Sequence, residues 1–194
     1  MTRFYWLRHG PTHQTAMTGW RDVPADLSDT ALIARVAALL PADALVVSSD
    51  LIRARATADA LAGPRPRLPD LPALRELHFG DWDGLHFADI AARDSVRSRA
   101  YWETPGDIAP PNGESWNAAS ARIETAVQHL AAAYPGRAVI VVAHFGPILT
   151  QVARALDQPP ATALAQRIDP LSLTEIAFTA QGRQLLRVNQ LPSA

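Results

Sequence analysis

The chain has 194 residues, a formal net charge of −1 and 48% hydrophobic residues, which is typical of one domain with a substantial hydrophobic core. All 18 basic residues are arginine and there is no cysteine, which excludes Schiff-base lysines, Walker-type phosphate loops, disulfide frameworks and thiol nucleophiles. The near balance of charges argues against a nucleic-acid partner.

No apolar stretch is long enough to cross a membrane. The longest strongly apolar runs, such as Ala138–Ala143, fall far short of the roughly 20 residues that a span requires. The run Met1–Arg8 does not resemble a secretory signal, because its apolar part stops at Arg8 and no small-residue cleavage site follows. We therefore expect a cytoplasmic protein without a membrane partner.

Three short apolar runs predict buried strands. They are rich in β-branched or aromatic residues, and each is followed by a helical pattern or by a turn that leads to one. The runs are Phe4–Leu7, Ala44–Val47 and Ala138–Ala143. Strands that alternate with helices favour an α/β fold, a three-layer sandwich in which helices cover both faces of a mostly parallel sheet.

Apolar residues at helical spacing predict four helices between and after these strands. Ser48 or Ser49 is the expected N-cap of the second helix, and Pro147 suits the first turn of the fourth. The four helices are expected over about residues 32–40, 51–61, 115–133 and 147–156.

The remaining segments are a terminal hairpin and proline-rich loops. Residues 173–178 and 184–188 flank a short polar segment and predict an antiparallel pair. Between the proline clusters at 64–72 and 105–111, the chain predicts one or two short helices over the sheet. No repeat or linker divides the sequence, so we expect a single domain over residues 1–194. Within it, about residues 80–112 are expected to form a small cap that sets specificity.

Arginine and histidine follow the predicted strands at the points where they end. Arg8 and His9 follow the first strand, Arg53 lies in the first helical turn after the second, and His144 follows the third. In open α/β sheets the functional site lies beyond the carboxyl ends of the strands, where helix N-termini also favour anions. The planar fork of arginine matches phosphate oxygens. The sequence therefore predicts a pocket for a phosphate dianion.

Five short blocks follow one another along nearly the whole chain. They are Leu7-Arg8-His9-Gly10, the run Val47–Ala54 followed by Thr57-Ala58, Leu74-Arg75-Glu76 with Phe79–Gly84, Gly113-Glu114-Ser115, and Val141–Gly146. In this order they resemble the histidine phosphatase superfamily, which includes the cofactor-dependent phosphoglycerate mutases. The resemblance implies a phosphoglycerate mutase-like fold and a metal-independent phosphomonoesterase.

The resemblance also implies a role for each site residue. His9 would be the nucleophile that forms a phosphohistidine, while Arg8, Arg53 and His144 would hold the phosphoryl oxygens. Glu76 would protonate the departing alkoxide and then activate water. No metal and no other cofactor are expected, and the substrate would be a small-molecule phosphate ester.

Three positions depart from the family pattern. Pro11 stands where Glu or Gln is usual, Thr15 where asparagine is common, and Phe145 where the final block usually has glycine. Thr15 keeps a hydroxyl donor and Phe145 keeps its backbone N–H, so we expect both at the phosphate subsite. Trp20 and Trp102 are the tryptophans expected to line the substrate pocket.

The resemblance leaves three functions open. Mutases of the family carry a long insertion between the blocks of Glu76 and Gly113, and its absence here favours hydrolysis. Residues 80–82, 111–114 and 186–189 resemble α-ribazole phosphatases, so α-ribazole 5'-phosphate or a related metabolite is an expected substrate. A phosphoglycerate mutase and an inactive phosphate-binding module are the alternatives. The sequence does not decide between a monomer and a homodimer.

Overall fold

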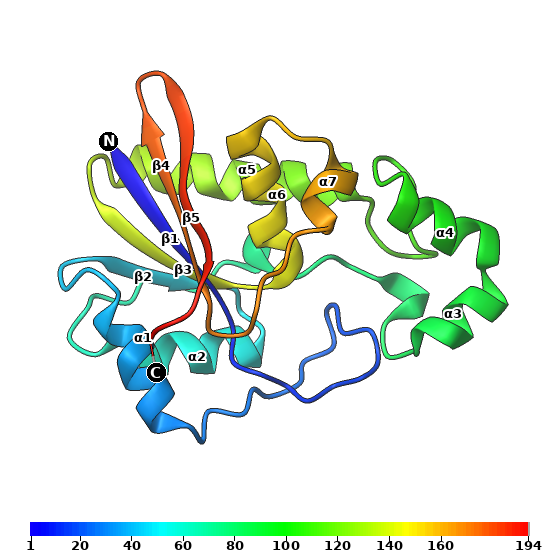
Figure 1. The fold of residues 1–194 in the computed structure, drawn as a ribbon, viewed down its shortest axis with the longest axis horizontal. Helices are drawn as coiled ribbons and strands as arrows, with labels where there is room; N and C mark the ends of the chain where they lie inside the picture. The colour runs from blue at the N-terminus through cyan, green and yellow to red at the C-terminus, as the bar shows by residue number, and fades with distance from the viewer. Residues whose placement is uncertain (194) are drawn as a thin grey trace.

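The computed structural model describes residues 1–193 and shows a five-stranded sheet with the strand order β2-β3-β1-β4-β5 (Figure 1). β1 (Thr2–Arg8), β2 (Leu45–Ser48) and β3 (Ala138–Ala143) are parallel. β4 (Leu173–Thr179) pairs antiparallel with β1 and with β5 (Gly182–Gln190). The predicted α/β fold with a mostly parallel sheet and a C-terminal hairpin is therefore confirmed.

Helices cover both faces of the sheet (Figure 1). α1 (Thr30–Ala38) and α2 (Ile52–Ala62) pack on one face, and α5 (Trp116–Ala133) and α6 (Phe145–Leu156) pack on the other. The short α7 (Pro160–Leu164) packs against α6. Within residues 1–193, no helix combines the length and the apolar character that crossing a bilayer requires.

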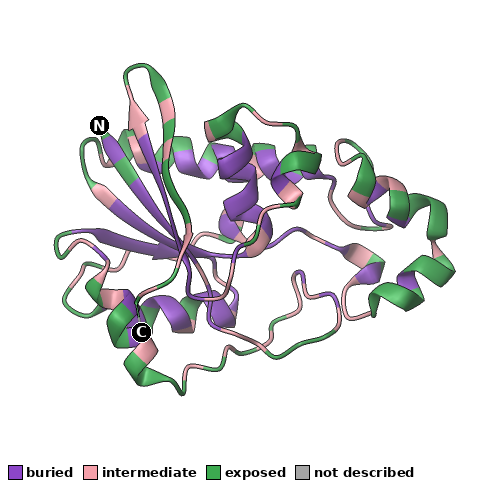
Figure 2. Cartoon of the chain, viewed as in Figure 1, coloured by how far each residue is buried: buried purple, intermediate pink, exposed green. Residues whose placement is uncertain are grey.

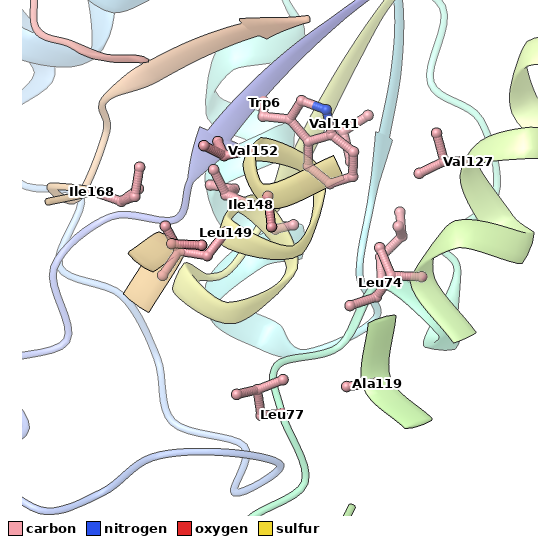
Figure 3. Packing of buried hydrophobic residues seen from close by; sticks show 14 of the residues in the cluster. Trp6, Leu74, Leu77, Ala119, Val127, Val141, Ile148, Leu149, Val152 and Ile168 are labelled. Carbon is pink, nitrogen blue, oxygen red and sulfur yellow. The ribbon is translucent and has the colours of Figure 1, made fainter. Parts of the chain in front are cut away.

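The alternation of side chains along β1 explains why its sequence is apolar throughout. Phe4 and Trp6 point into the core on the α5 and α6 side, whereas Tyr5 and Leu7 point into the core on the α1 and α2 side. All four are at most 8% exposed, and Figure 2 shows the central strands buried. Figure 3 shows Trp6 beside the side chains that α6 contributes to this core.

The two helices of the predicted cap lie beyond the edge of the sheet, so their expected position over the sheet is wrong (Figure 1). α3 (Phe87–Arg93) and α4 (Ser95–Glu103) are largely exposed (Figure 2). They pack instead on Trp82, whose ring lies 5.6 Å from that of Tyr101 and whose indole N–H donates to Asp94. Buried aromatic contacts between these segments therefore replace contact with the sheet.

The expected serine N-cap of α2 is also wrong. The N-cap is Leu51, with an extended backbone and no side-chain hydrogen bond, because α2 begins only at Ile52, three residues beyond Ser49. Ser48 donates instead to Asp70, and Ser49 Oγ lies 2.6 Å from His144 Nε2. Ser49 therefore belongs to the site at the strand ends.

Candidate active site

The carboxyl ends of β1 and β3 and the first turn of α2 open into a cavity of about 560 Å³. Arg8, His9, Arg53 and Glu76 line one end of it. His144 is fully buried behind them, with its ring centroid 5.1 Å from that of His9. The structure thus brings together all five residues for which the sequence predicts a catalytic role.

The imidazole of His9 is held in one tautomer. Its Nδ1 lies 2.7 Å from the carbonyl oxygen of Gly10, and because a carbonyl only accepts, Nδ1 must carry the proton. The Nε–H of Arg53 donates to Nε2 of His9 over 3.3 Å. Both contacts place the lone pair of the ring on Nε2, which faces the cavity as the candidate nucleophile and here accepts the hydrogen bond from Arg53.

The surroundings of His9 also keep the ring neutral. Burial, followed by the positive charges of Arg53 and Arg8, lowers the pKa of His9 to about 3. The imidazole is therefore uncharged at every physiological pH.

We expect His9 to keep its Nδ1–H tautomer without titrating between about pH 5 and pH 8, the range in which an ordinary histidine gains its charge. Nitrogen-15 NMR spectra of the imidazoles measure this directly, because protonation shifts the Nε2 resonance strongly. A short histidine-containing peptide in the same buffer serves as the reference. A midpoint for His9 near that of a free imidazole would contradict the neutral nucleophile.

Arg53 is rigidly oriented although it is a long side chain. It is 1% exposed, and its two terminal nitrogens donate to the carbonyl oxygens of Arg21, over 2.8 Å, and Gly19, over 2.6 Å. The loop that carries these carbonyls is itself fastened by Asp83. The carboxylate of Asp83 accepts from the backbone N–H groups of Gly19 at 3.0 Å and Arg21 at 2.9 Å. Asp83 therefore positions Arg53 through the loop.

Replacement of Asp83 by asparagine is expected to lower kcat/KM about 10- to 100-fold, because a shift of about 1 Å in Arg53 is enough for such a loss. The acidic limb of the pH profile should also move to higher pH, because the charge of Arg53 helps to lower the pKa of His9. Steady-state rates measured across pH test both effects.

The matched control for this prediction is Asp81→Asn. The carboxylate of Asp81 is 41% exposed and faces Asn112 and Arg93 at the surface. A loss of rate in Asp83→Asn without any movement of the acidic limb would mean that Asp83 supports only the fold.

Glu76 is a buried carboxyl group, and within residues 1–193 only its Oε2 is left without a hydrogen-bond partner. Its Oε1 accepts from the backbone N–H groups of Leu77 at 3.0 Å and Gly146 at 2.9 Å. Burial is the main cause that raises the pKa of Glu76, so the group holds a proton at higher pH than an ordinary carboxyl. Because Oε1 accepts two hydrogen bonds, the proton belongs on Oε2. A Cβ at Gly146 would overlap Oε1, which explains the glycine there.

Trp20 supports Glu76 and does not line the cavity, in contrast to its expected place. Its indole N–H donates to the carbonyl oxygen of Glu76 over 2.7 Å, and its ring stacks on the guanidinium of Arg75 at 4.8 Å. Arg122 donates to the same carbonyl over 3.3 Å. The backbone of Glu76 is thus fixed from two sides.

His144 and Arg8 complete the cluster, and each keeps a free polar atom. Nδ1 of His144 and Nε of Arg8 are buried and have no hydrogen-bond partner within residues 1–193. Burial and the charges of nearby groups lower the pKa of His144 well below its usual value. A guanidinium nitrogen of Arg8 donates to the carbonyl oxygen of Ile168 over 2.7 Å, which fixes its direction. Arg8 lines the cavity and can therefore still bind an anion, while His144 lies behind the lining.

Three of the other predicted site residues line the cavity, and a further residue stabilises the loop after His9. Thr15, Trp102 and Phe145 line the cavity, while contact of Thr15 and Phe145 with a bound phosphate stays a prediction. The sequence pattern indicates no role for Thr57, yet its hydroxyl accepts from the N–H of Gly10 over 3.0 Å and so supports the loop after His9. Within residues 1–193, no group of three or more His, Cys, Asp or Glu side chains is arranged to hold a metal ion.

Comparison with known families agrees with this geometry. The model described as the histidine phosphatase superfamily, branch 1, matches residues 4–191. The chain therefore belongs to that superfamily, and the resemblance stated from its sequence is confirmed at that level.

Individual relatives come from several bacteria. A protein of Mycobacterium tuberculosis described as bifunctional is 34% identical over 97% of this chain, but the chain spans only 54% of that relative. The adenosylcobalamin/alpha-ribazole phosphatase of Salmonella typhimurium is 32% identical over 64% of this chain and 62% of its own length. The glucosyl-3-phosphoglycerate phosphatase of Mycobacterium tuberculosis is 37% identical over 82% of this chain and 77% of its own length.

Solved structures support the same fold. Bacillus stearothermophilus YhfR superposes with a TM-score of 0.89 at 28% identity, over 100% of this chain and 98% of that one. The expected phosphoglycerate mutase-like architecture is thereby confirmed.

Proposed function

We propose that the protein hydrolyses small phosphomonoesters through a phosphohistidine on His9, without a metal. One observation carries the proposal, namely the hydrogen bond from Nδ1–H of His9 to the carbonyl of Gly10, which directs the lone pair to Nε2. Arg8, Arg53 and His144 bind the phosphoryl oxygens, and Glu76 is the general acid and base.

The reaction takes two balanced steps. In the first, Nε2 of His9 forms a bond to phosphorus while the ester P–O bond breaks, and the departing alkoxide takes the proton of Glu76. In the second, the Glu76 carboxylate takes a proton from water as the oxygen attacks phosphorus and the P–N bond breaks. Inorganic phosphate leaves, and His9 is neutral and Glu76 protonated again.

The charge balance of the cluster suits this chemistry. The guanidinium groups of Arg8 and Arg53 supply two positive charges, while both histidines are neutral because burial lowers their pKa values. Glu76 adds no negative charge while it holds its proton, because burial raises its pKa. An incoming phosphate dianion therefore meets net positive charge and a neutral nucleophile.

The particular ester is the finer part of the proposal. We take α-ribazole 5'-phosphate, or a metabolite related to it, as the first candidate, since one of the relatives is named a phosphatase of this compound. Another relative is named for glucosyl-3-phosphoglycerate, which is the second candidate. A panel of metabolite phosphates that includes both compounds ranks them by kcat/KM.

Trapping the intermediate tests the mechanism. We expect rapid mixing with an aryl phosphate, quenched with base, to leave a phosphoryl group on the peptide that contains His9, in the presence of a chelator. Mass spectrometry locates the group, and its lability in acid distinguishes a phosphohistidine from a phosphoserine. A phosphoryl group on another residue or a strict metal requirement would overturn the mechanism. Interconversion of phosphoglycerates dependent on bisphosphoglycerate would show a mutase instead.

A further inference from the structure

The cavity continues from His9 to a wall of aromatic side chains that the proposed chemistry does not use. The ring of Trp102 lies 6.1 Å from the ring of Phe79 and 6.1 Å from that of Phe87, and Phe145 lines the cavity as well. These residues come from α3, α4, α6 and the turn before Gly80, so four separate segments contribute one wall. At about 560 Å³ the cavity can hold a ligand considerably larger than phosphate.

The outermost ring of this wall is exposed. Phe87, the first residue of α3, is 58% exposed, and Trp102 is half-buried. Trp102 packs against the border of the hydrophobic core, whereas Phe87 is not among the side chains packed on it. Apolar surface at the mouth of a cavity gains free energy when a ligand covers it. The wall therefore favours a flat apolar group.

The charges of the lining lie only at the end that His9 occupies. Among residues 1–193, the charged side chains that line the cavity are Arg8, Arg53 and Glu76. The rest of its polar surface is neutral and comes from threonines and a glutamine in residues 12–18. A second anionic group on a substrate would therefore find no cation beside it.

Arg21, a further cation that contacts two residues of the lining, is already engaged. Arg21 does not line the cavity, its Nε lies 3.4 Å from the carboxylate of Asp83, and it donates to the side chains of Gln14 and Thr18. Asp83 offsets its charge. Hydroxyl and amide groups at Gln14 and Thr18 can still bind the hydroxyls of a sugar or another neutral alcohol.

We infer that the site takes phosphomonoesters of neutral alcohols that carry an aromatic or similarly flat apolar group, and discriminates against esters with a second anionic group. The inference rests on the proposed phosphatase function and assigns specificity to the cap, residues 80–112, through Phe87 and Trp102. Phe145 extends the wall next to the reacting group, where its ring lies 5.6 Å from the guanidinium carbon of Arg8. The bulk at this position thus becomes a part of substrate choice.

Three esters of primary alcohols test this preference. Their leaving groups have similar reactivity, so differences in rate report on how the cavity binds each group. We expect kcat/KM for benzyl phosphate to exceed that for butyl phosphate by about tenfold or more, because hydrophobic pockets discriminate between groups that differ by this much apolar surface to about that extent. We also expect it to exceed 4-carboxybenzyl phosphate by about tenfold or more, because the carboxylate is desolvated without a partner. The rates are measured as released phosphate.

Two variants assign the preference to the wall. Phe87→Ala should lower the ratio of the benzyl to the butyl rate, and it should fold normally because Phe87 is exposed. Gln14→Arg places a cation in the lining and should raise the rate for the carboxybenzyl ester relative to the benzyl ester. Val96→Ala is the matched control, since Val96 is an 84% exposed apolar residue on α4 that does not line this cavity.

Binding separates this inference from the proposed function. Calorimetry with benzylphosphonate and 4-carboxybenzylphosphonate, which cannot be hydrolysed, measures the preference of the cavity whether or not the enzyme turns over. Absence of turnover together with selective binding of benzylphosphonate would overturn the phosphatase and leave the inference standing. Equal affinities for the two phosphonates, or a benzyl preference that Phe87→Ala does not lower, would overturn the inference.

Discussion

Replacement of His9 by alanine is expected to lower kcat/KM for an aryl phosphate by about 10⁴-fold or more, as the loss of a nucleophile does in other covalent catalysts. The reason is specific to this site. The lone pair on Nε2 belongs to a neutral imidazole that lines the cavity with Arg8 and Arg53, and neither arginine can replace it because both stay protonated. Initial rates with 4-nitrophenyl phosphate, with and without chelator, measure the loss.

A matched histidine and a binding measurement complete this experiment. His129 lies exposed on α5, so His129→Ala should behave like the wild type. Because His9→Ala leaves Arg8 and Arg53 in place, it should still bind inorganic phosphate, which isothermal titration measures. A His9→Ala variant within tenfold of the wild-type rate would contradict the phosphohistidine mechanism.

The strand ends explain why much of this site could be predicted from sequence. Parallel strands bring their carboxyl ends to one edge, so Arg8, His9 and His144 could be placed together from their positions after apolar runs. Arg53 followed from its position in the first turn after β2. The apolar runs predict these strands reliably because both faces of each strand are buried, which requires a nearly continuous hydrophobic sequence.

The supporting residues could not be predicted because their partners lie far away in the sequence. Ser49 pairs with His144 at a separation of 95 residues, Asp83 with Gly19 at 64, and Trp20 with Glu76 at 56. A serine just before a helix fits the pattern of an N-cap, and a tryptophan in a loop fits that of a pocket wall. Only the packed fold shows that each has a different hydrogen-bond partner.

The hydrogen bonds of Arg53 show why a lysine could not replace this arginine. Three of its nitrogens donate at once, in one plane, to His9 and to the carbonyls of Gly19 and Arg21. A lysine ammonium is a point charge on a flexible stem and could not orient three such acceptors in a plane. Three simultaneous hydrogen bonds therefore fix the guanidinium of Arg53, and Asp83 fixes the loop that carries two of the three acceptors.

Replacement of Glu76 by glutamine is expected to have a large effect that depends on the leaving group. The amide oxygen can keep the hydrogen bonds from Leu77 and Gly146, but the group can no longer transfer a proton. For an alkyl phosphate, whose alkoxide must be protonated, kcat/KM should fall by about 10²- to 10⁴-fold. For 4-nitrophenyl phosphate the first step should lose much less, because nitrophenolate leaves without a proton.

Two further observations distinguish this role from a structural one. Dephosphorylation needs Glu76 as base, so the variant should release a burst of nitrophenolate and then turn over slowly. The wild-type kcat/KM for an alkyl ester should fall as the pH rises through the pKa of Glu76, which burial raises. Glutamine does not titrate, so this alkaline limb should vanish in Glu76→Gln, whereas the exposed Glu103→Gln should keep it. Equal losses for both esters with the limb intact would exclude acid catalysis by Glu76.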